Sequence, residues 1–175
     1  MYTIREINDM SQESFIESIG PIFEHSPWIA ERTWHRGPFE DKAALLEALQ
    51  KDMYRASEAE HLSLLRAHPD LGTKMEVTSA SRSEQQGAGL DQLTTDEYDA
   101  LTRMNEAYKE RFAFPFILAV KGKTKQDILT DIERRRHHTL QVERDTALRE
   151  VAAIASFRLE ALVADSAASR QAGMA

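Results

Sequence analysis

Apolar residues recur at spacings of three and four along most of this chain, which is the pattern of α-helices that each bury one face. Two such stretches begin with a capping box, formed by Ser57 with Glu60 and by Thr94 with Glu97. The alternating pattern typical of a half-buried strand is almost absent. We therefore expect an all-α fold, a single-domain bundle of about seven to nine helices. The clearest apolar stripes are Phe15, Ile19, Ile22 and Phe23; Leu45, Leu46, Leu49 and Met53; and Val151, Ile154, Ala155, Leu159 and Leu162.

The length and charge of the chain limit what it can bind. At 175 residues and 42% hydrophobic content it fits one compact domain, which we expect to span residues 1–165. Residues 166–175 are mostly small and polar, so a disordered tail is expected there. With 22 basic and 29 acidic side chains the net charge is -7, which argues against binding of nucleic acids or anionic membranes. A small-molecule partner fits this composition better.

Composition also excludes several kinds of site. There is no cysteine, which excludes disulfides, thiolate-bound zinc, iron–sulfur clusters and a thiol nucleophile. Charged residues interrupt the N-terminal segment, so no signal peptide is expected. The longest apolar run, Phe112 to Val120, has nine residues and contains a proline, against roughly 20 for a membrane-spanning helix. We expect a cytoplasmic protein without a membrane span.

His68 is the first candidate for chemistry, because it stands in the loop-forming sequence H-P-D-L-G. Pro69 stops a helix that arrives from Glu58, so the imidazole is expected at a helix end, where side chains project into clefts. Imidazole titrates near neutrality, which suits a general acid or base. The alternative is a structural C-cap that interacts with the last carbonyls of the helix.

Glu84 lies in the sequence S-R-S-E-Q that starts at Ser81, and two interpretations stay open. Ser81 can cap a short helix with Glu84 as its capping-box partner. Glu84 can instead reach across a cleft to the substrate or to His68, where it would fix the tautomer of the imidazole. The sequence does not separate the two.

Arg158 is a cation within the apolar stripe of the last predicted helix. Burial of a guanidinium group is unfavourable unless the group is paired. Three outcomes follow: Arg158 reaches the surface with its charged end, pairs with an internal acid such as Glu84, or binds an anionic ligand.

Three phenylalanines surround Pro115, and the apolar residues Ile117 to Val120 and then Lys121 follow. Pro115 can be the first residue of a short helix, or the segment can be extended, with backbone N–H and C=O groups available to a polar heterocycle. A plain core segment is the default interpretation.

His137 and His138 follow the three arginines Arg134 to Arg136, a pattern typical of a solvated basic patch. No ligand spacing such as H-E-x-x-H accompanies them, so no metal site is predicted.

Several short motifs occur together in this chain. They are G-P-I-F-E-H-S-P-W at Gly20 to Trp28, H-P-D-L at His68 to Leu71, S-x-x-E-Q at Ser81 to Gln85, N-x-x-Y at Asn105 to Tyr108, F-x-F-P-F at Phe112 to Phe116, and R-L at Arg158 and Leu159. In this order and spacing they resemble the OHCU decarboxylase family, and the likeness covers residues from about Phe15 to Leu162.

The resemblance implies an all-helical homodimer that uses neither a metal nor an organic cofactor. It implies catalytic roles for His68, Glu84 and Arg158, with Pro69 beside the imidazole. In the family an asparagine often stands where this chain has His137 and His138, which concerns the local surface or dimer contacts more than the chemistry. The stretches that match the substrate contacts of the family are Ser81, Arg82, Ser83, Glu84 and Gln85, and Ile117, Leu118, Ala119, Val120 and Lys121.

The resemblance also implies a reaction, the conversion of 2-oxo-4-hydroxy-4-carboxy-5-ureidoimidazoline (OHCU) to (S)-allantoin and carbon dioxide in urate degradation. The expected partner is therefore this small purine catabolite. An alternative of a different class is a non-catalytic helical module that binds a purine-derived ligand through Arg158 and the segment from Phe112 to Lys121. Accelerated release of carbon dioxide distinguishes the enzyme from the binding module.

Overall fold

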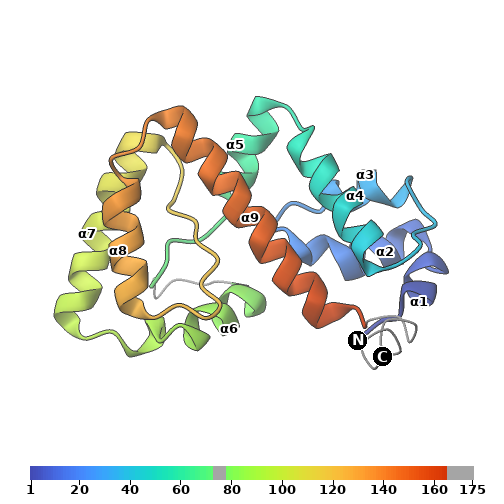
Figure 1. The fold of residues 1–175 in the computed structure, drawn as a ribbon, viewed down its shortest axis with the longest axis horizontal. Coiled ribbons are helices and arrows are strands. Elements are labelled where there is room, and N and C mark those ends of the chain that lie inside the picture. Colours follow the sequence, from blue (N-terminus) through green and yellow to red (C-terminus); the bar gives the residue numbers. More distant parts are fainter. Residues whose placement is uncertain (73–77, 165–175) are drawn as a thin grey trace, which may run out of the picture. The chain divides into compact units, whose positions relative to one another are not determined.

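The computed structural model describes residues 1–72 and 78–164, and it is helical, as the apolar periodicity predicts (Figure 1). Nine α-helices and two short 3-10 helices, η1 and η2, account for the regular structure of these residues. None of these helices is long and apolar enough to cross a membrane. The predicted tail at 166–175 lies outside the described residues. The chain divides into two compact units, one formed by Met1–His61 and the residues from Ala152 onward, the other by Leu62–Val151.

The first unit is built on the predicted apolar stripes. Phe15 and Ile19 from one stripe and Leu45, Leu49 and Met53 from another are at most 1% exposed. Burial of these faces is the main favourable contribution to the stability of the unit. Its helices are α1 (Ile4–Asn8), α2 (Gln12–Ile19), η1 (Gly20–Ile22), α3 (Trp28–Trp34), α4 (Lys42–Tyr54), the start of α5 (Glu58–Arg66) and the end of α9 (Leu140–Leu162).

Backbone pairing joins the first and last described segments of this unit. The N–H of Tyr2 donates to the Leu162 carbonyl at 2.8 Å, and the N–H of Ala164 donates to the Tyr2 carbonyl at 2.7 Å. These bonds make an isolated parallel bridge between Tyr2 and Val163. The end of α9 is therefore attached to the start of the chain.

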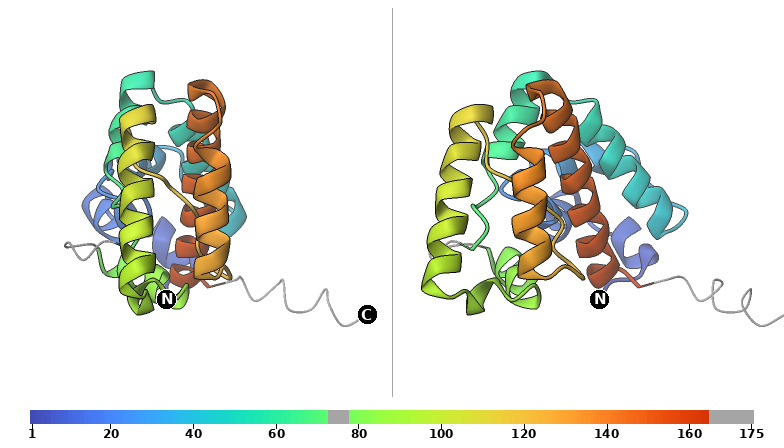
Figure 2. Two further views of the ribbon diagram at one scale, coloured as in Figure 1. Left: turned by 90° about the vertical axis from the view of Figure 1, so that its left-hand side faces the viewer. Right: turned by 60° about the vertical axis from the view of Figure 1, so that its left-hand side comes forward.

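The second unit contains α6 (Ser79–Gly87), η2 (Leu90–Gln92), α7 (Thr95–Phe112), α8 (Lys125–Arg135) and the first part of α9. Helices α7 and α8 lie side by side and run in the same direction, because residues 113–124 bring the chain back between them (Figure 2). The predicted capping box of Thr94 and Glu97 begins α7. In the first unit the predicted box of Ser57 and Glu60 is also present, with bonds of 2.8 and 3.2 Å.

A buried polar network connects α7, α8 and α9 in the second unit. Arg135 is 1% exposed and donates to Glu143 Oε1 through Nε at 2.8 Å and through Nη2 at 2.5 Å. Glu143 also accepts from the Tyr108 hydroxyl and lies 2.8 Å from His138 Nδ1. Burial, followed by the bond to Glu143, raises the pKa of Tyr108 far above its usual value. The prediction of a solvated basic patch is therefore wrong for Arg135 and for the half-buried His138.

Candidate functional site

The imidazole of His68 lies at the C-terminal end of α5, as predicted. Helix α5 ends at Arg66, and the N–H of His68 reaches the Leu65 carbonyl at 3.3 Å. His68 is buried, and its Nδ1 lies 2.9 Å from the carbonyl oxygen of Leu64. Because a carbonyl oxygen only accepts, Nδ1 carries the hydrogen, and proton transfer by the neutral ring runs through Nε2. The bond to a helix carbonyl, which was the contact expected of a structural C-cap, thus also fixes the tautomer of His68.

The loop that follows His68 is held by side chains from two helices. Asn105 Nδ2 on α7 donates to the Leu71 carbonyl at 3.0 Å. Gln85 Oε1 on α6 accepts from the N–H of Gly72 at 2.9 Å. Asn105 is buried in α7, where Leu101, Tyr108 and Phe112 are buried too. Loop residues held in this way carry an imidazole in a defined position.

A cavity of about 530 Å³ borders His68 within the second unit. Lys109 Nζ pairs with Asp70 Oδ2 at 2.5 Å, and Arg66 Nε donates to the Ala113 carbonyl at 2.8 Å. Two fixed cations against one acid favour an anionic molecule in this cavity. The residues that line it are Arg66, His68, Asp70, Lys109, Ala113, Phe114 and Pro115. Sequence reasoning did not select Arg66 or Lys109, because nothing local to either residue indicates its proximity to His68.

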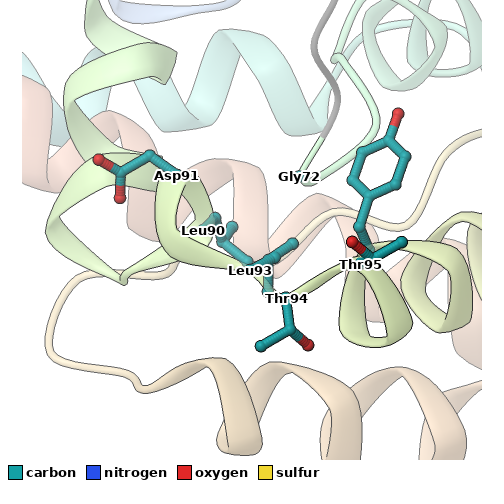
Figure 3. A pocket seen from close by; sticks show the side chains of 7 residues that line it. Gly72, Leu90, Asp91, Leu93, Thr94 and Thr95 are labelled. Carbon is teal, nitrogen blue, oxygen red and sulfur yellow. The ribbon is translucent and has the colours of Figure 1, made fainter.

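A second cavity, of about 450 Å³, lies where the same loop meets η2 and the start of α7 (Figure 3). The loop thus contributes to both cavities, through His68 and Asp70 to the first and through Gly72 to the second. Gly72 has a φ of 74°, and a Cβ there would lie 2.7 Å from Leu101 Cδ2. Glycine adopts this φ readily, whereas any other residue would be strained and would displace the Leu101 side chain. The residues that line the second cavity are Gly72, Leu90, Asp91, Leu93, Thr94, Thr95 and Tyr98.

Helix α6 begins earlier than the sequence suggests. Its N-cap is Thr78, whose hydroxyl accepts from the N–H of Ser81 at 3.3 Å. The interpretation of Ser81 as an N-cap, with Glu84 as its capping-box partner, is therefore wrong, because Ser81 is already in the first turn. Glu84 lies in the helix interior and is half-buried.

One face of α6 carries part of the predicted substrate-binding stretch. Ser81 and Gln85 are buried and Glu84 is half-buried, and a helix brings positions three and four residues apart to one side. Arg82 and Ser83 are exposed on the other side. The bond from the N–H of Gly72 to Gln85 attaches α6 to the His68 loop, at the residue that follows Glu84.

The segment after α7 is extended, which was one of the two predicted structures, and the alternative of a helix starting at Pro115 is wrong. Ile117, Leu118, Ala119 and Val120 are buried, whereas Lys121 is exposed. Two of the backbone groups that were predicted to be available to a heterocycle instead form hydrogen bonds to side chains of the protein. Arg135 Nη1 donates to the Ile117 carbonyl at 2.7 Å, and the Ala119 N–H donates to Glu150 Oε2 at 2.8 Å.

Arg158 lies on α9 in the first unit and pairs with an internal acid, which was one of the three predicted outcomes. That acid is Glu24, whose Oε2 is 3.0 Å from Arg158 Nη1. The side chains are 8% and 1% exposed, so the pair is buried. The same nitrogen lies 3.4 Å from the carbonyl oxygens of Pro21 and Ile22. Sequence reasoning named Glu84 as the example and missed Glu24, which stands within the G-P-I-F-E-H-S-P-W motif.

The described residues contain no group of three or more histidine or acidic side chains arranged to hold a metal ion. His68 and Glu84 lie in the second unit, where the Gly72–Gln85 bond ties their segments together. Arg158 lies in the first unit.

Comparison with known proteins gives a consistent result. Residues 8–160 match the family model described as OHCU decarboxylase. The chain is 44% identical over 157 residues to the 2-oxo-4-hydroxy-4-carboxy-5-ureidoimidazoline decarboxylase of Haloferax volcanii, which covers 90% of this chain and 94% of that protein. It is 40% identical over 160 residues to the uric acid degradation bifunctional protein of a Bacillus species, covering 91% of this chain and 32% of that one. The crystal structure of an (S)-allantoin synthase superposes with a TM-score of 0.76 at 29% identity, over 92% of this chain and 54% of that one.

Proposed function

Because the chain belongs to the OHCU decarboxylase family, we propose that it is a carboxy-lyase that converts OHCU to (S)-allantoin and carbon dioxide in purine and urate catabolism. The observation that carries the proposal is the hydrogen bond that fixes the tautomer of His68. A carbonyl at a helix end holds its Nδ1, so that Nε2 is the atom that exchanges a proton with a substrate. Histidine in one fixed tautomer is the kind of group that this reaction needs.

The substrate supplies its own electron sink. Its carboxylate stands on the ring carbon next to a C=N bond. When carbon dioxide leaves, the electron pair of the broken bond forms a C=C bond, and the pair of the C=N bond moves to nitrogen, which takes a proton. The resulting enol becomes allantoin when its hydroxyl loses a proton and the neighbouring carbon gains one. We therefore propose catalysis without a metal or an organic cofactor, in which the protein orients the substrate and places the proton-transfer groups.

His68 is proposed to take the hydroxyl proton through Nε2 and, as imidazolium, to supply the proton that reaches the neighbouring carbon. Delivery from a single side of the ring gives one enantiomer. Glu84, half-buried on α6, is proposed to stabilise the imidazolium by its negative charge. Its helix is attached to the His68 loop through Gln85, which supports this role.

Arg158 is proposed to hold an anionic or carbonyl part of the substrate, each charge-assisted bond contributing roughly 1.5 to 3 kcal/mol. Tight pairing with the departing carboxylate would stabilise the ground state more than the transition state and slow the reaction. The ureido carbonyl is therefore the favoured partner. The pairing of Arg158 with Glu24 supports a fixed orientation of the guanidinium.

The remaining contacts are proposed from the family stretches. Pro69 would pack beside the imidazole. The buried face of α6 and the extended segment would form the inner wall, and the exposed residues the rim. The inner residues are Ser81, Gln85, Ile117, Leu118, Ala119 and Val120, and those of the rim are Arg82, Ser83 and Lys121.

We also propose that the protein is a cytoplasmic homodimer. The family resemblance supports the dimer, and a cysteine-free composition with a small-metabolite substrate is consistent with the cytoplasm. Light scattering coupled to gel filtration measures the assembly, and a single-chain mass at micromolar concentration would contradict it.

Freshly generated OHCU, followed by circular dichroism and by release of carbon dioxide, tests the function. We expect the wild-type protein to form (S)-allantoin faster than the spontaneous reaction. His68→Ala should lower kcat by about 100-fold or more, the usual contribution of a positioned acid or base. Glu84→Ala and Arg158→Ala should also lower turnover. His137→Ala is the matched control, because this histidine is exposed in the same unit.

The outcomes separate the alternatives. Near-wild-type turnover by His68→Ala would remove its catalytic role. If calorimetry detects allantoin binding while the protein does not accelerate release of carbon dioxide, the chain is a binding module and the proposed function is wrong.

A further inference from the structure

The peptide group between Leu71 and Gly72 is held on both sides. We propose that Asn105 is a positioning residue for the decarboxylation: together with Gln85 it clamps this peptide and thereby sets the placement of His68 relative to Glu84. We call these two carboxamides and the Leu71–Gly72 peptide the peptide clamp. The inference rests on the proposed function and concerns residues that do not themselves react.

The geometry defines the clamp. Asn105 Nδ2 donates to the carbonyl of this peptide at 3.0 Å, and Gln85 Oε1 accepts from its N–H at 2.9 Å. The carbonyl and the N–H belong to one rigid plane, so two opposed bonds fix its orientation. They also fix the two side-chain amides, because a carbonyl requires the NH2 end of Asn105 and an N–H requires the oxygen of Gln85.

The clamped peptide is close to the imidazole along the chain. Only Pro69 and Asp70 separate His68 from Leu71, and the pyrrolidine ring fixes one of the intervening torsions. Gly72 adopts a φ of 74°, which favours glycine, and a Cβ there would lie 2.7 Å from Leu101 Cδ2. The imidazole is thus joined to the clamped peptide by a short segment of backbone in which one torsion is fixed.

The other half of the clamp belongs to the helix of the proposed acid. Gln85 follows Glu84 directly in α6, and both lie in the same turn. A displacement of the loop thus changes the position of His68 relative to that turn. Asn105 belongs to α7, so its bond attaches the loop to a further segment of the chain besides α6.

Stability alone does not account for an asparagine at this position. Asn105 is 4% exposed, in a stripe with Leu101, Tyr108 and Phe112. Its Oδ1 is buried and has no hydrogen-bond partner among residues 1–72 and 78–164. A buried oxygen without a partner destabilises the folded state, whereas leucine has a similar shape and no such oxygen. The carboxamide is useful for the bond that its nitrogen makes to Leu71.

Asn105→Leu tests the clamp, because it keeps the shape and removes the donor. We expect kcat to fall by about 10- to 100-fold, as expected when a reacting group is misplaced, while KM changes by less than about 3-fold, because the substrate contacts stay. The pH profile of kcat and the imidazole 15N signals of His68 should also change. A merely structural asparagine moves neither the pH profile nor these signals.

Asn8→Leu is the matched control. Asn8 also bonds to backbone through its carboxamide, donating to the Phe39 carbonyl and accepting from the Phe39 N–H at 2.8 Å each, but it lies in the first unit. This variant should lose stability and keep the wild-type kcat, pH profile and His68 signals. If Asn105→Leu does not fold, Asn105→Ala, which removes the same donor and places no methyl group against the Leu71 carbonyl, takes its place.

Each outcome decides one of the two proposals. Wild-type kcat and unchanged His68 signals in Asn105→Leu would overturn the clamp. Absence of OHCU turnover in the wild-type protein would overturn the proposed function instead, and the His68 signals would still decide whether the clamp holds the imidazole.

Discussion

Two buried arginine–glutamate pairs, one in each unit, differ in how tightly they are held. Arg135 donates to Glu143 with two nitrogens at 2.5 and 2.8 Å, and the same acid accepts from the Tyr108 hydroxyl. Arg158 Nη1 lies 3.0 Å from Glu24. Arg135 is the more deeply buried of the two arginines, yet we assign it to the scaffold. Burial of an arginine therefore does not by itself mark a functional site.

The largest expected effect is on stability, from Arg135→Met. It leaves Glu143 buried without its cation, which should lower the free energy of unfolding by about 3 to 5 kcal/mol in urea titration. Turnover per folded molecule should stay near that of wild type. Arg135→Met with Glu143→Leu should regain part of the loss, because no buried charge remains, although the Tyr108 hydroxyl loses its acceptor. Lost turnover in a stable double variant would contradict the assignment of this pair to the scaffold.

The corresponding double variant of the other pair, Arg158→Met with Glu24→Leu, separates the two roles. Stability should again be near that of wild type, since both charges are removed together. Here kcat/KM for OHCU should stay reduced by about 10- to 100-fold, the equivalent of one charge-assisted bond of roughly 1.5 to 3 kcal/mol. A double variant as active as the wild type would show that Arg158 also belongs to the scaffold.

A smaller effect is expected from Tyr108→Phe, which removes one bond to Glu143 and should lower stability by about 1.5 kcal/mol at neutral pH. Burial raises the pKa of this phenol, so its contribution is present below the unfolded pKa near 10 and is lost as the pH rises above it. Wild-type stability should therefore fall more steeply above pH 10 than that of Tyr108→Phe. Equal slopes in alkaline urea titrations would argue against a buried phenol.

The smallest effect is expected at an exposed pair, Arg32 with Glu60, which sets the lower end of the comparison. The bond to Arg32, followed by those to Ser57, lowers the pKa of Glu60 to about 2. The contribution of this depressed pKa is present above the unfolded value of 4.5 and is lost as the pH falls toward 2. In Glu60→Gln the free energy of unfolding should fall slightly less as the pH is lowered from 4.5 toward 2 than it does in the wild-type protein. The same acid dependence in both proteins would show that solvent screens the pair.

Features that depend on local spacing could be predicted from the sequence. The helical class, the capping boxes at Ser57 and Thr94 and the helix end at His68 follow from rules that operate within one or two turns. The same rules failed at Ser81, because Thr78, three residues earlier, is an equally good cap.

Features that depend on a distant partner could not be predicted. The acid that pairs with Arg158 is 134 residues away, and no spacing rule connects them. Arg135 stands in a run of basic residues that is usually solvated, and its burial depends on the return of α9 past α8. The peptide clamp joins three segments of the chain, each of which is unremarkable alone.

The bridge between Tyr2 and Val163 brings the entry and exit of the described chain to one place. A domain whose two ends are adjacent can be inserted into a longer polypeptide through short linkers, because the flanking residues of that polypeptide stay close together. For the same reason, joining the two ends and opening the chain at an exposed turn should yield a circular permutant that retains the original packing.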